Sequence, residues 1–577
     1  MGLPKATARP DEARHSSSKL VIDTIDSACG VVRLEGRVVA KGDDARPASV
    51  IHVQSSKGKV SAVKRQELER QNRDGGTIRY WQFSIVVNVD PERDRIAFSL
   101  GDGESQSLGC EIAPGPFFPV GRKFRRAYAK IGAYLAKWSG EGTISIARAS
   151  MVRHFSRELL LGMEMIASNL FAFRNGELVI RPYVVVNCIV RAAYFVARKF
   201  RRREVWFVSD RDDRAGDNGE AFFRHMLKEH PEYKVYFLLE RTSPDYDRLK
   251  AIGHVLDLKS PFFKIVKYFA DVILSSQIGG LLDSPGARSY EYFRDIMAST
   301  RHIFLQHGVI LHDLSSWLWR YRNNLDGFVT SCPREHESLK APAYAYSPDT
   351  LWLTGLPRFD RLTGKTCRQI LIMPTWRHEL TPRRNKRTGL WEGDGDFCDS
   401  DYFKFYNRLL NDQRLLAAAK ARGYRLFFCP HPNFHQFLGR FEKNEMVEFC
   451  SPKTQYRDVF VASDLVVTDY SSAVFDFAYM RKPIVYAQFD RDTFFQGSQA
   501  IQHGYFEYER DGFGEIETTL NGTVERVVEY LRNDCKVKDL YLRRMNDFFA
   551  YDDHGGCERI FRKVVQLESR PAFRADT

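Results

Sequence analysis

A strand-like segment that runs directly into a helix start constrains this chain more than any other feature. The apolar residues 465–467 precede Asp469, Ser471 and Ser472, and apolar residues then recur at helical spacing in 474–478. This pattern predicts a strand, a tight turn and the first turn of a helix. Unpaired N–H groups and the helix dipole at such a turn attract phosphate. An ordinary capped helix in an α/β domain is the alternative interpretation.

Three other junctions place polar side chains directly after a strand-like segment. They are His307 and Gly308 after residues 302–305, Thr375 and Arg377 after residues 369–373, and His431 after residues 426–429. Ligands of open α/β sheets bind beyond the carboxyl ends of the strands. The four junctions together therefore predict one site with groups suited to phosphate.

The composition sets broad limits on what the chain can be. With 577 residues it is too long for a single hydrophobic core, and 44% hydrophobic and 28% charged residues are typical of a globular protein. The net charge of +13 suits an anionic partner: nucleic acid, an anionic membrane or a phosphorylated substrate. Ten scattered cysteines without a CxxC pair or zinc spacing predict reduced thiols in a cytosolic protein. The polar N-terminus predicts no signal peptide, and no apolar run is long enough to span a bilayer.

The first 203 residues divide into three parts by their sequence pattern. Residues 1–28 are predicted to form a disordered tail, and the period-two segments of 29–114 predict a small β-sandwich. Residues 115–203 are predicted to be helical and basic. Basic helices with aromatic faces lie on anionic membranes, and we expect this of at least one such stretch, including 261–269. Helices packed on the protein with a solvated basic face are the alternative.

From Glu204 onward, strand-like and helix-like segments alternate. The turn-like residues 355–360 interrupt the alternation, which resumes at Ile370 and continues to about Phe561. Two successive alternating halves predict two Rossmann-like domains with parallel sheets, at 204–360 and 361–577. The predicted fold class is therefore α/β, with this pair of domains preceded by the β-sandwich and the basic helices.

Several short motifs follow one another in this second part of the chain. They are His307-Gly308, Gly355-x-Pro357-Arg358-x-Asp360, Pro374-Thr375-Trp376-Arg377, His431-Pro432, Asp469-Tyr470-Ser471-Ser472 with Asp476, and Asp553-x-Gly555-x-x-x-Arg559. In this order they resemble the CDP-glycerol glycerophosphotransferases, the teichoic-acid primases and polymerases of bacteria, over about 204–565. The resemblance implies a GT-B fold, with an acceptor domain at 204–360 and a CDP-donor domain at 361–577. The loop after Gly308 departs from the family's usual pattern, which leaves the acceptor and the polyol open.

The resemblance also implies a reaction, in which an acceptor hydroxyl attacks the β-phosphorus of CDP-glycerol and CMP leaves. His307 is the candidate general base, since imidazole titrates near neutrality and Gly308 lets a substrate approach the backbone. A buried and fully satisfied His307 is the alternative. His431, held between two prolines, is the second catalytic candidate and would bind the transferred phosphoryl group. The expected donor-binding residues are Thr375, Arg377, Asp469, Ser471 and Ser472, supported by Gly308, Arg358 and Asp476.

Neither a metal nor a cofactor is expected, because phosphoryl transfer depends mainly on positioning and charge stabilisation. The acidic pair Asp394 and Asp396 lies in a Gly-rich loop and predicts a loop rather than a metal site. The basic residues within 381–387 predict either a solvated loop or a lid that guides a polyanionic acceptor.

The expected partners are CDP-glycerol or another CDP-polyol, a lipid-linked or polymeric acceptor, and an anionic membrane. The corresponding location is cytoplasmic, peripheral on the inner face of the cell membrane, in teichoic-acid or capsule synthesis. A GT-B glycosyltransferase that uses a nucleotide sugar is the second hypothesis. Charge alone suggests a nucleic-acid-binding protein, but RNP, KH, zinc-finger and helix-turn-helix signatures are missing from the sequence, so no nucleic acid is expected.

Overall fold

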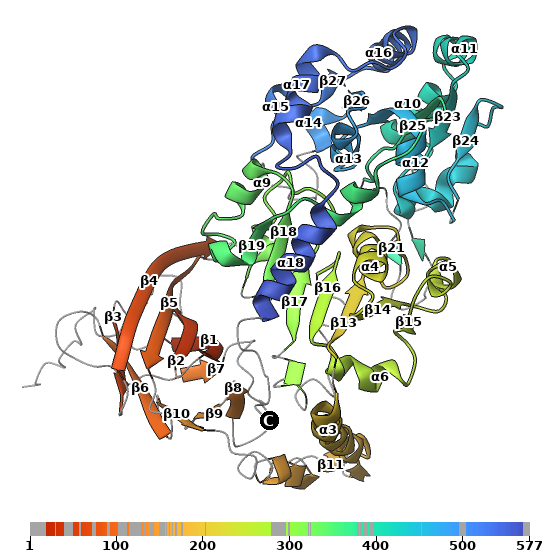
Figure 1. The fold of residues 1–577 in the computed structure, drawn as a ribbon. Coiled ribbons are helices and arrows are strands. Elements are labelled where there is room, and N and C mark those ends of the chain that lie inside the picture. Colours follow the sequence, from red (N-terminus) through yellow and green to blue (C-terminus); the bar gives the residue numbers. More distant parts are fainter. Residues whose placement is uncertain are drawn as a thin grey trace, which may run out of the picture.

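The structure is a computed structural model (Figure 1). Before residue 203 it describes the strands and the helix named below and parts of 156–170. Within 203–568 it describes all residues except 279–292, 294–295, 298–299, 321, 324, 378–379, 381–382, 385–390, 393–396, 452 and 495–503. The predicted loop at Asp394 and Asp396 and most of the basic segment 381–387 lie outside the described residues.

The N-terminal part is a β-sandwich of two five-stranded sheets, drawn in red and orange in Figure 1. Their inner faces share one core that includes Leu34, Trp81, Phe83, Ile96 and Ile144. One sheet has the order β4-β5-β2-β1-β7, with β1 Lys19–Ala28, β2 Val31–Val39, β4 Lys59–Gln71, β5 Thr77–Asn88 and β7 Ile112–Pro114. The other has the order β3-β6-β10-β9-β8, with β3 Val50–Ser55, β6 Arg93–Gly101, β8 Tyr128–Ile131, β9 Tyr134–Trp138 and β10 Thr143–Arg148.

Two predictions for this part of the chain are wrong. Residues 19–28 of the predicted tail form β1, which pairs with β2, while residues 1–18 lie outside the described residues. Residues 128–148 of the predicted helical segment form β8, β9 and β10. Short apolar runs fit both the helical and the strand period. Here the pairing of β10 with β6 and β9 gives the strand conformation. A hairpin follows, with β11 Phe171–Arg174 and β12 Glu177–Ile180, and the long helix α3 spans Tyr183–Phe200.

The first Rossmann-type domain contains a seven-stranded sheet in which every neighbouring pair is parallel. Its order is β15-β14-β13-β16-β17-β18-β19, with β13 Val205–Ser209, β14 Lys234–Leu239, β15 Val255–Asp257, β16 Val272–Ser275, β17 Arg301–Phe304, β18 Gly327–Thr330 and β19 Leu351–Leu353. The helices are α4 Asn218–Glu229, α5 Tyr246–Lys250, α6 Phe263–Val266 with η1 Lys267–Phe269, α8 Ser315–Leu318, α9 Pro333–Ser338 and η2 Pro348–Thr350. The strand order reverses at β13 and β16, and the loops that follow β13 and β17 carry the site.

The second Rossmann-type domain contains a six-stranded parallel sheet of order β24-β23-β20-β25-β26-β27. Its strands are β20 Gln369–Ile372, β23 Arg425–Phe428, β24 Val447–Phe449, β25 Ser463–Thr468, β26 Ile484–Ala487 and β27 Gly514–Glu517, and β21 Arg383–Arg384 pairs with β22 Trp391–Glu392 outside this sheet. Its helices are α10 Asp401–Leu410, α11 Gln413–Ala421, η5 Pro432–Arg440, α12 Tyr456–Ala462, α13 Val474–Tyr479, α14 Arg491–Phe494, α15 Tyr508–Asp511, α16 Leu520–Arg532 and α17 Asp539–Phe548.

Two elements join these domains. The short helix η3 Pro357–Arg361 follows β19 and leads into the second sheet. The last helix, α18 Gly556–Glu568, returns to the first domain, where Phe561 contacts Trp206 and Glu558 contacts His225 and His230 on and beside α4 (Figure 1). The predicted GT-B-like pair of Rossmann-type domains is therefore confirmed. In the part of the chain that the structure describes, no helix combines the length and apolarity needed to cross a bilayer.

Candidate active site

The four predicted junctions lie at the carboxyl ends of strands in the two parallel sheets. β17 leads to His307, β20 to Thr375, β23 to His431, and β25 to Asp469 and the serines. The strand–turn–helix prediction for 465–478 is confirmed, because β25 ends at Thr468 and α13 begins at Val474. Since β23, β20 and β25 are adjacent, three of the junctions share one sheet edge, and His307 comes from the other domain.

His307 is exposed and bound to a carboxylate. Its Nδ1 lies 2.6 Å from Oδ2 of Asp217, and 67% of its side chain is accessible to solvent. The alternative of a buried, satisfied histidine is therefore wrong. The charge and hydrogen bond of Asp217 raise the pKa of His307. Partial desolvation of the ring and the charge of Arg358 oppose this effect. Because Nδ1 faces Asp217, Nε2 is the nitrogen that can accept a proton from a substrate.

Asp217 was not predicted from the sequence. It is the N-cap of α4 and accepts a hydrogen bond from the backbone N–H of Asn218 at 2.9 Å. Burial opposes its ionisation, but the charges of Arg358 and His307 outweigh that effect and lower its pKa. The sequence did contain a signal, because the buried strand β13, like the strands of the other junctions, is followed directly by polar residues, here an acidic loop at 210–217.

Asp210, at the start of that loop, organises the turn that presents Asp217. Its carboxylate accepts backbone hydrogen bonds from Asp217 at 3.0 Å, Gly219 at 2.7 Å and Glu220 at 3.1 Å. Ser276, after β16, donates a further bond. Burial and the nearby charge of Asp217 raise the pKa of Asp210 to about 7. The carboxylate that faces His307 is thus positioned by residues that follow the adjacent strands β13 and β16.

Arg358 connects His307 with the second domain. Its guanidinium forms two bonds with Asp476 on α13, at 2.8 and 2.7 Å, and one with Asp217 at 2.8 Å. It also donates to the backbone carbonyl of His307. Asp476 is fully buried, and burial raises its pKa while Arg358 lowers it. Arg358 therefore orients Asp217 and His307 relative to the helix that follows Ser471 and Ser472.

The two halves of the site pack closely against each other at Gly308. A Cβ atom at this position would lie 2.8 Å from Oγ of Ser472, 3.5 Å from its Cβ and 3.8 Å from Arg358. The first distance is well inside van der Waals contact, so any side chain here would force the Ser472 hydroxyl to move. Gly308 thus lets the loop after His307 pack directly against the serine turn.

Arg377 and Asp469 form a buried brace beneath this turn. The Arg377 guanidinium is 3% exposed and bonds to Asp469 at 2.9 Å, to Asp490 at 2.7 and 3.1 Å, and to the Thr375 carbonyl at 2.7 Å. Asp469 in turn accepts the backbone N–H groups of Thr375 and Tyr470. The expectation of an Arg377 fork open to a diphosphate disagrees with this geometry, because carboxylates already occupy the fork.

The other polar groups near the buried Arg377–Asp469 ion pair are the hydroxyls of Thr375, Ser471 and Ser472. The Thr375 hydroxyl is buried and, among the described residues, has no hydrogen-bond partner. Ser471 and Ser472 are half-buried, and Oγ of Ser471 accepts a bond from the N–H of Ala473 at 3.2 Å. An unsatisfied buried hydroxyl costs free energy unless a ligand pairs with it. The Thr375 hydroxyl would therefore gain by pairing with a bound molecule, but in this structure it is closed to solvent.

His431 differs from His307 in its protonation. Its ring stacks on Trp376 with centroids 5.6 Å apart, and a ring nitrogen accepts a bond from the N–H of Asn433. Burial, with smaller contributions from Arg211, His435 and His307, lowers the pKa of His431 to about 4. The imidazole is neutral near pH 7 and acts there as a hydrogen-bonding group rather than a cation.

Two further motifs hold the domains together. Asp360 accepts the backbone N–H groups of Gly556 and Cys557 at 2.8 and 2.7 Å, and so fixes the start of α18. Arg559 on α18 bonds to the carbonyl of Thr354 and to Asp553. These residues fix how the domains sit across the site.

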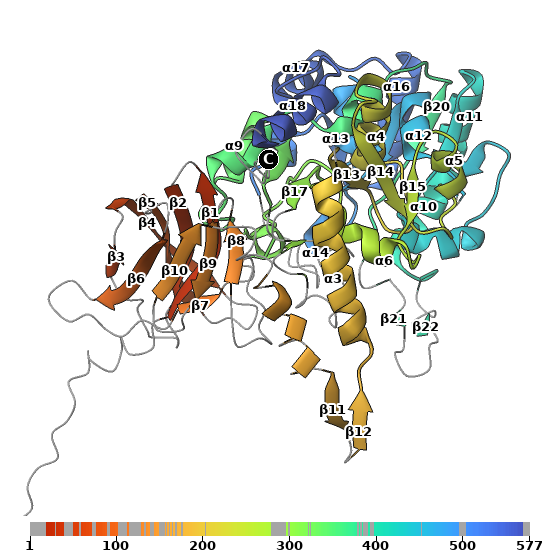
Figure 2. The same ribbon diagram turned by 60° about the horizontal axis from the view of Figure 1, so that its bottom comes forward.

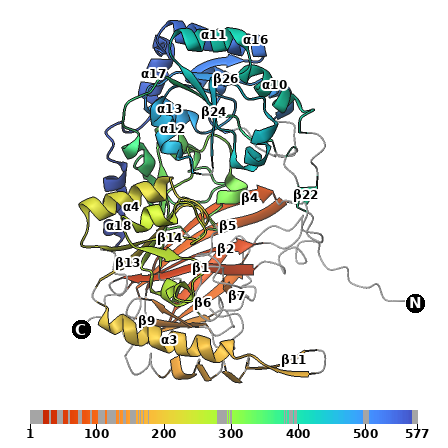
Figure 3. The ribbon, with the colours of Figure 1, turned by 90° about the vertical axis from the view of Figure 1, so that its right-hand side faces the viewer.

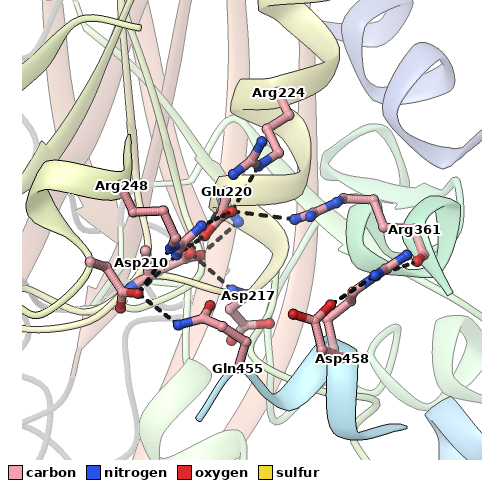
Figure 4. A network of polar contacts seen from close by, with 12 residues as sticks. Asp210, Asp217, Glu220, Arg224, Arg248, Arg361, Gln455 and Asp458 are labelled. Atoms are coloured by element: carbon pink, nitrogen blue, oxygen red, sulfur yellow. Dashed lines mark hydrogen bonds and ion pairs between the residues drawn. The ribbon is translucent and has the colours of Figure 1, made fainter. Parts of the chain in front are cut away.

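A network of ion pairs also ties α4 to the second domain (Figure 4). The buried Glu220 accepts bonds from Arg248 at 2.6 and 2.7 Å and from Arg224 at 2.8 Å, and Arg361 of η3 lies at 3.4 Å. Gln455, before α12, donates to Asp245 at 2.8 Å. The helix that carries Asp217 at its start is thus fixed from both domains.

Comparison with known proteins agrees with these observations. A family model described as CDP-Glycerol:Poly(glycerophosphate) glycerophosphotransferase matches residues 190–566. The minor teichoic acid biosynthesis protein GgaB of Bacillus subtilis is 35% identical over 382 residues, which are 66% of this chain and 42% of that protein. The teichoic acid poly(glycerol phosphate) polymerase of the same organism is 22% identical over 410 residues, 64% of this chain and 49% of that protein. The chain thus spans less than half the length of these curated relatives.

Among solved structures, the wall teichoic acid polymerase TagF matches with a TM-score of 0.48 and 15% identity, over 73% of this chain and 98% of that one. The resemblance predicted for about 204–565 coincides with the range of the family model. Since that model matches well over half of the chain, the protein belongs to the CDP-glycerol:poly(glycerophosphate) glycerophosphotransferase family.

Proposed function

We propose that the protein transfers glycerol phosphate, or a related polyol phosphate, from CDP-glycerol or another CDP-polyol to an acceptor hydroxyl in teichoic-acid or capsule synthesis. The observation that carries this proposal is the exposed His307–Asp217 pair of one domain, packed through Gly308 against the serine turn of the other. Family membership supports the donor, because the family's name specifies CDP-glycerol.

In the proposed reaction, Nε2 of His307 takes the proton of the acceptor hydroxyl. The hydroxyl oxygen forms a bond to the β-phosphorus of the donor while the bond from that phosphorus to the CMP oxygen breaks. Asp217 holds the Nδ1–H tautomer and stabilises the imidazolium that forms, and Arg358 holds Asp217. CMP leaves with the negative charge of its phosphate.

On the donor side, the neutral His431 donates a hydrogen bond to the phosphoryl group in transit, and the hydroxyls of Thr375, Ser471 and Ser472 bind the diphosphate oxygens. Arg377 and Asp469 position Thr375 and Tyr470, as their buried mutual bonds indicate. Removing a hydroxyl such as Ser471→Ala therefore weakens donor binding directly, whereas Arg377→Ala acts through the loop and lowers stability as well.

We also propose that the protein is cytoplasmic and peripheral on the inner face of the cell membrane, with a lipid-linked or polymeric acceptor. Support comes from α3, where Val186, Ile189, Val196 and Phe200 are 55%, 62%, 60% and 79% exposed at helical spacing. On the neighbouring α6, Phe262 and Ile265 are exposed beside the exposed Lys264. An apolar face with basic neighbours suits an anionic lipid surface.

The test is donor screening with CDP-glycerol, CDP-ribitol and sugar nucleotides, with CMP release as the readout. CMP release in the presence of an acceptor, abolished in His307→Ala, is the expected result. His302→Gln serves as the matched control, because His302 lies on the same strand at the end away from the site. Nucleoside diphosphate release from a sugar nucleotide would instead support the glycosyltransferase alternative, and normal turnover in a folded His307→Ala would contradict the assigned base.

A further inference from the structure

Behind the loop that carries His431, three potential metal ligands meet. Cys429 follows β23, Cys450 follows the neighbouring edge strand β24, and His435 lies in η5. The two thiols are 0% and 5% exposed, and His435 is half-buried. The Sγ atoms and a ring nitrogen of His435 all lie within 4.8 Å of one another.

The spacing of these atoms fits a shared cation. Sγ of Cys450 lies 3.4 Å from Nε2 of His435. With a Zn–S bond of about 2.3 Å and a Zn–N bond of about 2.0–2.1 Å, two tetrahedral ligands stand roughly 3.5 Å apart. The Pro430 carbonyl oxygen lies 3.1 Å from the same Nε2. That carbonyl accepts the Nε2 proton when no cation is bound, and it lies near enough for itself or a water to complete the coordination.

The donor set selects the class of metal. Two thiolates and one imidazole are ligands of Zn²⁺, whereas Mg²⁺ and Ca²⁺ require oxygen ligands. A disulfide between Cys429 and Cys450 is the competing chemistry for the two thiols. It would leave His435 without a role in the cluster, whereas a metal uses all three side chains.

We propose that Cys429, His435 and Cys450 form a structural zinc site in the second Rossmann-type domain. Zinc bound to Cys429 and His435 closes the segment 430–434, which contains His431, into a short loop anchored at both ends. The cation thus limits the movement of His431 without touching substrate. The binding of zinc does not depend on the proposed transferase function, since it follows from the ligands alone.

The sequence did not reveal this site because its spacing is unusual. Five residues separate Cys429 from His435 and fourteen separate His435 from Cys450, with no CxxC pair. The parallel pairing of β23 and β24, in which Phe428 lies opposite Phe449, brings the two cysteines that follow them side by side. Only the tertiary structure places the ligands together.

The test measures metal in the full chain, purified without chelator or metal-affinity steps. About one zinc per chain is expected from the proposed ligand set, and Cys429→Ser, Cys450→Ser and His435→Gln should lose it. Cobalt substitution should produce thiolate-to-cobalt absorption in the wild type and the control variants, and this absorption should be lost or altered in the three ligand variants. Cys535→Ser is a matched control, since Cys535 is buried in the same domain, apart from the proposed ligands.

A second possible metal group, His225, His230 and Glu558, contains no thiol, so His230→Gln controls for zinc bound there. If the cysteine variants fold poorly, chelation of the wild type should lower its unfolding temperature by several degrees and zinc should restore it. Zinc content equal in the wild type and the His435→Gln and cysteine variants would overturn the proposal. So would a protein mass showing that Cys429 and Cys450 are joined as a disulfide.

Discussion

The two ring nitrogens of His307 have different surroundings, and this difference defines its chemistry. Nδ1 lies 2.6 Å from the Asp217 carboxylate, which raises the pKa of the ring. Only the neutral ring accepts a proton, so base catalysis should increase as pH rises through that raised pKa and level off above it. The His307–Asp217 pair therefore predicts how the activity depends on pH, in addition to the loss of activity expected in His307→Ala.

Asp217→Asn should shift that profile. Asparagine retains the helix cap but removes the charge, so the pKa of His307 falls and the ascending limb of kcat/KM moves to lower pH. The plateau should also fall, by at most the roughly 10²–10⁴-fold that positioned proton transfer contributes. CMP release measured across pH tests this, with Asp213→Asn as the control, since Asp213 is 61% exposed in the same loop. An unshifted limb would show that Asp217 does not set the pKa of the base.

Gly308→Ala should destabilise the protein through one identifiable contact. The added methyl group would lie 2.8 Å from Oγ of Ser472, and overpacking of this kind costs about 1–3 kcal/mol. Ser472→Ala removes that oxygen and leaves a Cβ at an ordinary 3.5 Å. The double variant should therefore recover much of the loss in denaturant unfolding. Strictly additive effects of the two substitutions would exclude the proposed contact.

At the residue scale, the sequence identifies site residues best when a polar side chain directly follows a strand-like segment. His307, His431, Thr375 and the two serines were recognisable as polar residues after strands, and the structure places them at strand ends. Whether a charged group faces a ligand or another side chain depends on contacts distant in sequence. Arg377 meets Asp469 and Asp490 across 92 and 113 positions, and no local pattern encodes those pairs.

At the scale of elements, the short helix η3 determines how the two halves of the site meet. Arg358 on η3 bonds to Asp217 at the start of α4 and to Asp476 on α13. The carboxylate of Asp476 is almost inaccessible to solvent, so it depends on Arg358 for its charge. Removing one partner of a buried ion pair leaves a buried charge without a partner. The loss of stability is therefore larger than the stabilisation that the intact pair provides.

Arg358→Met should therefore lower the free energy of unfolding by about 3–5 kcal/mol. The pKa of Asp476, already raised by burial, rises further without Arg358. A carboxyl group with a raised folded-state pKa loses stability as pH increases, so the deficit should be larger at neutral than at mildly acidic pH. Urea unfolding at both pH values measures this. Arg562→Met is the control, because Arg562 on α18 is 70% exposed and its ion pair with Glu558, four residues earlier, should contribute less than about 1 kcal/mol. Equal losses in the two variants would contradict the assignment.

The elements themselves were predictable to different degrees. The alternation of buried strands and helices after residue 204 identified both parallel sheets, because strands buried on both faces are strongly apolar, as in β13. The strands β8–β10 were mistaken for helix. These strands are only four, five and six residues long, so local periodicity does not separate strand from helix there, and the pairing of β10 with β6 and β9 determines their conformation.

At the scale of the whole molecule, the β-sandwich lies beside the first Rossmann-type domain, and Figure 2 shows it next to β17 and α9. Arg320 forms an ion pair with Glu35 on β2, and Arg37 lies over the ring of Trp319, 5.2 Å from its centroid. Such contacts join residues almost three hundred positions apart, so the sequence predicted the sandwich but not its place. The first Rossmann-type domain thus carries two attached parts, the sandwich and α3.

α3 runs along the lower edge of the molecule in Figure 3, with one face packed on the protein and one exposed. Val184 and Tyr194 are buried, whereas Ile189 and Val196 are 62% and 60% exposed. We expect an anionic lipid surface to cover this face, and each nearby basic residue to add about 1 kcal/mol of attraction. Binding should consequently weaken as salt shortens the screening length.

Sedimentation with anionic and neutral vesicles, at low and high salt, tests this attachment. The wild type should pellet with anionic vesicles at low salt, and Ile189→Glu combined with Val196→Glu should remain in solution, because the introduced charges oppose both burial and electrostatic attraction. Leu540→Glu is the matched control, since Leu540 is 47% exposed on α17, far from α3 in all views. Equal recovery with both vesicle types, or unchanged binding of the α3 variant, would show that the exposed apolar face of α3 does not attach the protein to lipid.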